Sequence, residues 1–144
     1  MATTCSVSIT SDIAPGLGTI SKSMTLTKAG TVNDLEETTG FSRRKLAATT
    51  AVDLITMANE LVEPSDNTAA KVYVRNIGDG KGNIDKSQYV TISIGDTGGT
   101  PQEIGRLYGS DWLLMPLTVV DDKDVVAAPS TDNTVVLEYI MFFE

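Results

Sequence analysis

Strict alternation between apolar and polar residues constrains this chain more than any other feature. Between Lys71 and Gly95, Val72 and Val74 alternate with larger polar residues, and Val90 and Ile92 do so again further on. An alternation of period two predicts strands that bury one face. A Gly-, Asp- and Asn-rich segment joins the two runs, so the stretch predicts an antiparallel pair of strands around a solvated loop.

Comparable runs recur along the whole chain, separated by turn residues at intervals of roughly ten. Threonine, valine and isoleucine are abundant, and β-branched residues favour pleated, half-buried surfaces. The pattern predicts an all-β fold, a jelly-roll-like antiparallel β-sandwich with about eight strands. Pro116 cannot donate a hydrogen bond to a neighbouring strand, so its strand is expected to be interrupted or to lie at a sheet edge. Expected strands lie at 5–13, 21–27, 43–49, 71–78, 89–95, 103–108, 112–120, 125–128 and 134–143.

The segment 51–62 is the one place where helix and strand compete. Its apolar residues can be placed on one helical face, but Val52 and Leu54 also alternate with polar neighbours. We favour a strand over about 52–57, because tertiary context in all-β domains often overrides helical propensity.

The length of 144 residues fits one domain, predicted over 1–144, with an N-terminal arm over about 1–13. The N-terminus has no basic region followed by an apolar core, so no secretory signal is expected. The apolar stretches are too short to span a bilayer, and no membrane partner is expected. We therefore expect synthesis in a host cytoplasm.

Composition argues against most catalytic chemistry. The chain contains no histidine, and its single cysteine, Cys5, allows neither an intramolecular disulfide nor a cysteine-based metal cluster. The net charge is −8, which disfavours nucleic acid, and the one dense basic cluster, 43–45, is expected to be an exposed strand start. We predict a protein that is not an enzyme, with no catalytic residues, no cofactor and no bound metal.

One loop resembles a calcium site in the spacing of its oxygen-bearing side chains. Asp79, Asn83 and Asp85 alternate like the oxygen ligands of a calcium loop. However, Lys81 occupies one ligand position, and Val90 stands where a bidentate glutamate is required. A solvated loop is the better interpretation.

The last expected strand, 134–143, is apolar on both faces, and Glu138 is the one charged residue in it. Such a strand lies either in the centre of the core or against another subunit. We therefore nominate six residues as anchors of the core or of an interface, the first two in the N-terminal arm. They are Val7, Ile9, Trp112, Tyr139, Met141 and Phe143.

The second half of the chain resembles a family of virus proteins. Four segments carry the likeness: Lys-Val-Tyr-Val-Arg-Asn-Ile-Gly at 71–78, Tyr-Val-Thr-Ile-Ser-Ile-Gly at 89–95, 105–117 from Gly-Arg-Leu-Tyr-Gly-Ser-Asp-Trp onward, and Val-Leu-Glu-Tyr-Ile at 136–140. In this order they resemble small β-sandwich virion proteins of tailed bacteriophages, over roughly 70–144. The resemblance implies a compact sandwich, often a jelly roll, that works by assembly, and it transfers no site residues.

The resemblance implies a capsid decoration, or cement, protein located in the virion. Its expected partners are the major capsid protein or other virion proteins, and it is expected to form a homo-oligomer or a many-copy assembly. Two alternatives stay open: a tail or fibre component, and a carbohydrate-binding sandwich that uses Trp112 and nearby tyrosines.

Overall fold

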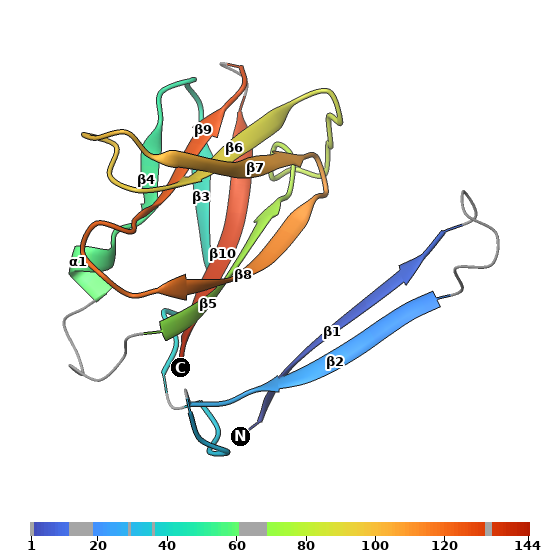
Figure 1. The fold of residues 1–144 in the computed structure, drawn as a ribbon. Coiled ribbons are helices and arrows are strands. Elements are labelled where there is room, and N and C mark those ends of the chain that lie inside the picture. The colour runs from blue at the N-terminus through green and yellow to red at the C-terminus, as the bar shows by residue number, and fades with distance from the viewer. Residues whose placement is uncertain (1, 12–18, 29, 36, 61–68, 132–133) are drawn as a thin grey trace.

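A computed structural model describes residues 2–11, 19–28, 30–35, 37–60, 69–131 and 134–144. Ten strands and one short helix lie within these ranges. Eight strands form two packed four-stranded sheets, and two form a separate hairpin (Figure 1). The predicted all-β antiparallel sandwich is therefore confirmed, with ten strands in place of about eight.

The first sheet has the strand order β3-β10-β5-β8, formed by Ser42–Leu46, Val135–Phe143, Ala69–Asn76 and Trp112–Thr118. The second sheet has the order β4-β9-β6-β7, formed by Val52–Ile55, Val125–Pro129, Tyr89–Ile94 and Gln102–Tyr108. Strands that follow one another in the chain occupy matching positions in the two sheets, which is the jelly-roll arrangement. Every pairing is antiparallel. Pro116 lies in β8, an edge strand of its sheet, as expected.

The core lies between the two sheets, where the alternating apolar residues meet. Val72 and Val74 of β5 face Val90 and Ile92 of β6, and all four side chains are fully buried. The sequence pattern had correctly identified these inward-facing positions. A sandwich core of this kind accounts for the stability of the eight strands without any disulfide.

The expected pairing of the two central strands was wrong. β5 pairs with β8 and β10, whereas β6 pairs with β7 and β9, so the two strands lie in opposite sheets. Alternation identifies a buried face but not the neighbour in the sheet, and the segment 77–88 is long enough to cross the roughly 10 Å between packed sheets.

The segment 51–62, for which both a helix and a strand were considered, contains a short strand followed by a helical turn. β4 ends at Ile55, and a single helical turn, α1, covers Met57–Glu60, so the strand predicted to Met57 is too long by two residues. The Met57 backbone N–H donates to Oδ1 of the buried Asp124 at 2.7 Å, and this bond holds the start of the turn against the sandwich. Residues 61–62 lie outside the described residues.

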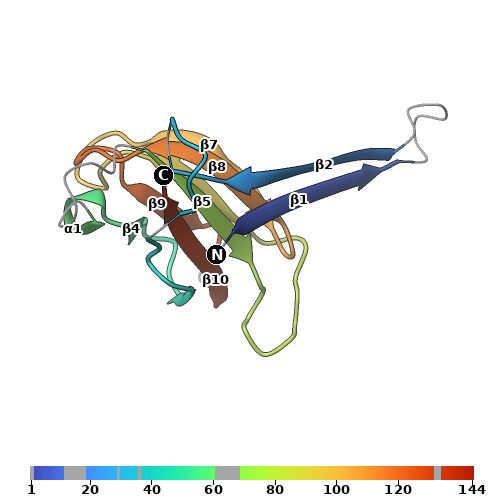
Figure 2. The ribbon, with the colours of Figure 1, turned by 90° about the horizontal axis from the view of Figure 1, so that it is seen from below.

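The N-terminal strands do not join either sheet. β1 (Thr3–Thr10) and β2 (Thr19–Leu26) form a hairpin that extends away from the sandwich, as Figure 2 shows from below. At about 3.3 Å per residue, the ribbon is about 25 Å long. Residues 12–13 of the predicted arm and the predicted turn at 15–18 lie outside the described residues.

Candidate assembly surface

The hairpin has two chemically different faces. Its register pairs Cys5 with Met24 and Ile9 with Ile20, so that directly opposed residues share a face. One face, called here the apolar face, carries Thr3, Cys5, Val7, Ile9, Ile20, Lys22, Met24 and Leu26. The other, the hydroxyl face, carries only serine and threonine: Thr4, Ser6, Ser8, Thr10, Thr19, Ser21, Ser23 and Thr25.

The apolar face is covered at its base and open toward its tip. Leu26, where the hairpin meets the rest of the molecule, is only 3% exposed. In contrast, Ile9 and Ile20 are each more than half exposed, and Met24 is 44% exposed. A two-stranded hairpin in water is marginally stable by itself. The distal half therefore exposes apolar side chains that the rest of its own chain does not cover.

The hydroxyl face forms hydrogen bonds between its own strands. Ser6 Oγ donates to Ser23 Oγ at 3.0 Å, and the hydroxyls of Thr10 and Thr19 lie 3.2 Å apart. These cross-strand contacts need no partner outside the hairpin. Of the two faces, the apolar one is therefore the candidate for contact with another molecule.

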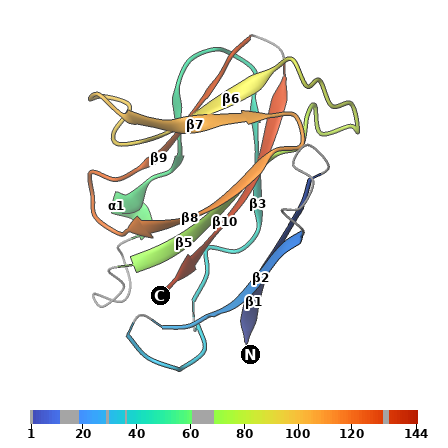
Figure 3. The same ribbon diagram turned by 45° about the vertical axis from the view of Figure 1, so that its right-hand side comes forward.

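A groove lies where the hairpin base meets the outer face of the sheet β3-β10-β5-β8. Its volume is about 700 Å³. Trp112 in the groove is 47% exposed, and its ring lies 6.3 Å from that of Tyr73 with a tilt of 35°. Figure 3 shows this sheet with the hairpin at its lower right. The groove is lined by Thr3, Thr4, Cys5, Ser6, Leu26, Phe41, Tyr73, Arg75, Ser110, Trp112, Leu114, Ile140 and Phe142.

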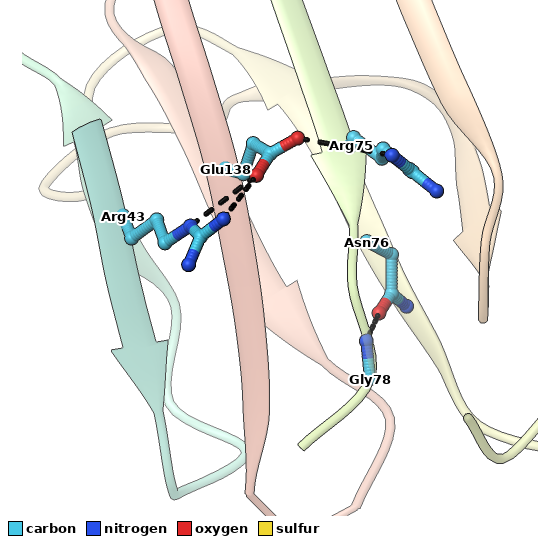
Figure 4. A network of polar contacts seen from close by, with 5 residues as sticks. All are labelled: Arg43, Arg75, Asn76, Gly78 and Glu138. Atoms are coloured by element: carbon cyan, nitrogen blue, oxygen red, sulfur yellow. Dashed lines mark hydrogen bonds and ion pairs between the residues drawn. The ribbon is translucent and has the colours of Figure 1, made fainter. Parts of the chain in front are cut away.

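Next to the groove, Glu138 holds two arginines on the same outer face. Arg43 Nε and Nη2 both donate to Glu138 Oε2, at 3.3 and 3.1 Å, and Arg75 Nη1 lies 3.9 Å from Oε1 (Figure 4). Glu138 is 7% exposed, so its carboxylate depends on these partners for compensation. Figure 4 also shows Asn76 accepting the N–H of Gly78, a contact that fixes the end of β5.

The six nominated anchors fall into two groups. Ile9 and Trp112 are exposed and Val7 is partly exposed, on the hairpin or in the groove. Met141 is fully buried and Phe143 is 8% exposed, both within the core, and Tyr139 packs against that core. For the latter three the core alternative applies, and their nomination as interface residues is corrected: the register places them on the inner side of β10.

The residues of β10 that do face the groove are Ile140 and Phe142, which sequence reasoning did not nominate. Alternation alone could not separate the two faces, because both are apolar. The signal that was available is Glu138: a charged residue marks the outer parity, and Ile140 and Phe142 share it. Phe41, 58% exposed beside the groove, has no comparable sequence signal.

The loop that resembled a calcium site uses its own carboxylates internally. Asp79 accepts from the Asn83 side chain and from the backbone of Lys81 and Asn83, and the Asn83 contact above all lowers the Asp79 pKa. Asp85 accepts from Ser87 and Gln88, and the Ser87 hydroxyl above all lowers the Asp85 pKa. These are turn-stabilising contacts.

The described residues also bear on metal binding, on membrane-spanning helices and on the basic cluster at 43–45. Within the described part of the chain, no group of three or more cysteine and acidic side chains is placed to hold a metal ion. In the same residues, no helix is long and apolar enough to cross a membrane. In the basic cluster, Arg43 pairs with Glu138 and Arg44 donates to the backbone carbonyl of Asp53, so two of its three cations have partners within the chain.

Comparison with known proteins adds a distant likeness. No protein-family model matches the chain, and no curated protein matches it. One solved chain, from Bacillus endospore appendages described as a novel family of disulfide-linked pili, aligns with a TM-score of 0.39 and 16% sequence identity. The alignment covers 78% of this chain and 93% of that chain.

Proposed function

We propose that this protein is a structural, non-enzymatic subunit of a many-copy assembly. The observation that carries the proposal is the amphipathic hairpin, whose exposed Ile9 and Ile20 extend away from a sandwich with its own complete core. Exposed apolar surface of this kind marks interaction sites in soluble proteins. In a shell or a filament, many modest contacts of one kind add up to strong attachment.

The specific assembly that we propose is the virion of a tailed bacteriophage, with this chain as a capsid decoration protein. Support comes from the resemblance of 70–144 to virion sandwiches and from the jelly-roll order of the sheets. The partners in this proposal are the major capsid protein and further copies of the chain. The decoration protein would clamp neighbouring capsomers by burying its apolar groove and hairpin.

The test is to purify particles of the phage that encodes the chain and quantify the chain by mass spectrometry. We expect a fixed ratio to the major capsid protein, and particles from a deletion strain should release DNA at a lower temperature. Particles that lack the chain, or deletion particles of unchanged heat resistance, would reject the decoration role. Immunogold label on the tail instead of the head would move the chain to a tail or fibre position.

A second candidate function is carbohydrate binding in the groove. The specific observation is the half-exposed Trp112 with Tyr73 beside it, because aromatic rings can stack on sugar rings. A glycan array should then show binding that Trp112→Ala abolishes. An array on which wild type and variant give the same background would remove this candidate.

A further inference from the structure

Two surfaces of the same chain are apolar, and the sandwich leaves both open. One is the distal half of the apolar face of the hairpin, and the other is the groove that holds Trp112. The hairpin strands extend away from their own sandwich (Figure 2), so the distal half of their apolar face lies apart from the groove at their base. A molecule that covers Ile9 and Ile20 is therefore a different one.

If that molecule is a second copy of the chain, charge limits which surfaces of the two copies can meet. Each copy carries a net charge of −8, so two copies repel over most of their surfaces. The two hairpin strands contain Lys22 and no acidic residue, and the groove lining contains Arg75 and no acidic residue. The hairpin and the groove are thus surfaces on which two acidic copies can meet without opposed carboxylates.

We propose that two copies exchange arms, each placing the apolar face of its hairpin in the groove of the other. The contact is isologous, so one symmetry operation covers both hairpins and both grooves. Packing of hairpin against hairpin would leave Trp112, Leu114 and Phe142 open, which makes it the poorer arrangement. This proposal rests on the proposed function and specifies how copies contact one another within the assembly.

The available area suits a weak contact between copies. The distal half of the apolar face, about 12 Å long and about 10 Å wide, offers about 120 Å², so the exchange buries two such faces and two matching groove surfaces, about 500 Å² in total. That is the size of weak, transient contacts. We therefore expect a weak dimer that is strengthened in an assembly of many copies.

The segment that joins the hairpin to the sandwich holds the hairpin in the extended orientation that Figure 2 shows. Its second half is fixed along β10: Thr38 Oγ1 and the Thr39 N–H both donate to the Met141 carbonyl, and the Phe143 N–H donates to the Glu37 carbonyl. Before this anchor, Gly30 adopts a positive φ of 74° in a turn where the Thr31 N–H donates to Lys28 O. A bridge between Thr27 and Asp34 and the hydrogen bond from the Lys28 N–H to the Asn33 carbonyl close this turn, so the hairpin keeps its orientation and its distal half stays available to a second copy.

The experiment uses Trp112, the only tryptophan of the chain, as a reporter inside the groove. Light scattering and tryptophan emission are recorded on the full chain from about 0.1 to 100 μM. We expect the mass to double and the emission to shift to shorter wavelength over the same concentrations. A dimer with unshifted emission would overturn the arm exchange in favour of hairpin-to-hairpin packing, and a monomer throughout would overturn it as well.

Variants locate the contact. The double variant Ile9→Asp, Ile20→Asp should weaken dimerisation at least 100-fold, while the matched pair Ser8→Asp, Ser21→Asp puts the same charges on the hydroxyl face and should dimerise like wild type. Circular dichroism and thermal unfolding of each variant confirm that the sandwich is intact. Equal dimerisation of the two double variants would overturn the proposal.

A mixing experiment separates arm exchange from other symmetric contacts. Leu114→Asp damages the groove but keeps the hairpin, and the Ile9→Asp, Ile20→Asp chain keeps the groove. We expect each to be monomeric alone and a mixture to form a heterodimer through one intact contact, with shifted emission from the copy that has the intact groove. A mixture that stays monomeric at concentrations 100-fold above the wild-type dissociation constant would contradict the exchange.

Particle incorporation distinguishes failure of this inference from failure of the proposed function. If the chain is monomeric but is present in purified particles, another virion protein covers the groove; the arm exchange is then wrong and the structural role stands. If the chain dimerises by arm exchange but is absent from particles, the exchange stands and the virion role is wrong.

Discussion

The sandwich and the N-terminal hairpin are built on the same alternation but use it differently. In the sandwich, the apolar residues of the central strands face a second sheet, so that Ile92 and Leu137 are fully buried. In the hairpin, the apolar parity faces nothing in the same chain over its distal half, and Ile9 is 54% exposed. The difference shows that alternation predicts which face needs cover, whereas only the fold shows whether the chain provides that cover itself.

The largest difference between the two regions should appear in core truncations. Met141→Ala should lower the free energy of unfolding by about 2–5 kcal/mol, because it removes a fully buried side chain and leaves a cavity. Ile9→Ala, measured at the same submicromolar concentration, should change it by less than about 0.5 kcal/mol. Urea unfolding followed by circular dichroism measures both. Equal losses would mean that the hairpin is part of the cooperative core.

The next effect concerns a polar link between the two sheets. Asn76, 2% exposed in β5, donates from Nδ2 to the Leu107 carbonyl of β7 at 3.0 Å and accepts the Gly78 N–H. Asn76→Ala leaves both backbone groups without these partners and should cost about 2–3 kcal/mol in urea unfolding. The matched control Asn33→Ala, at an exposed position outside the two sheets, should cost less than about 0.5 kcal/mol. A neutral Asn76→Ala would show that the sheets do not depend on this link.

A smaller effect is expected on the outer face of the sheet. Arg43→Ala removes the two hydrogen bonds that Glu138 Oε2 accepts, and Arg75 at 3.9 Å is the remaining ion-pair partner. Because the Arg43 side chain is 60% exposed, the loss should be only about 1 kcal/mol. Lys45→Ala, two residues along the same face of β3, is the control and should be nearly neutral. Thermal unfolding at low and high salt would measure the difference, which salt should reduce.

The smallest effect is a pH dependence that should belong to the sandwich alone. Burial raises the Asp124 pKa above its unfolded value of about 3.9, so the folded state binds this proton more tightly than the unfolded state. The stability that this group contributes is present below the unfolded pKa and is lost as the pH rises through the folded pKa. Asp124→Asn keeps an oxygen for the Met57 N–H, so its stability relative to wild type should improve between pH 3 and pH 7. The exposed control Asp122→Asn should show no such trend, and a parallel trend in the two variants would contradict burial as the cause.

Sequence predicted the sandwich well because its strands carry their burial pattern locally. Val72, Val74, Val90 and Ile92 were placed on the inner face correctly, and Pro116 was placed at an edge. Strand partners were not predictable in the same way, because a hairpin and a crossing between sheets require the same alternation on either side of a loop. For that reason the expected pairing of the strands around 77–88 failed.

The candidate surface was predicted only in part. Trp112 and Ile9 were nominated and are exposed, whereas Met141 and Phe143 were nominated for the core or an interface and lie in the core. Glu138 could have indicated the outer parity, but Phe41 and Tyr73 come to the groove from separate segments of the chain. Their proximity depends on the order of strands in the sheet, which local patterns do not encode.

Hydrogen exchange measured by mass spectrometry at two protein concentrations tests the central claim most directly. Peptides from the sandwich, such as those covering β5 and β6, should exchange at the same slow rate at 0.5 and 100 μM. Peptides covering β1 and β2 should be weakly protected at the lower concentration and at least tenfold slower at the higher one, because their cover comes from a second copy. Hairpin peptides with the same exchange rate at both concentrations would contradict the claim.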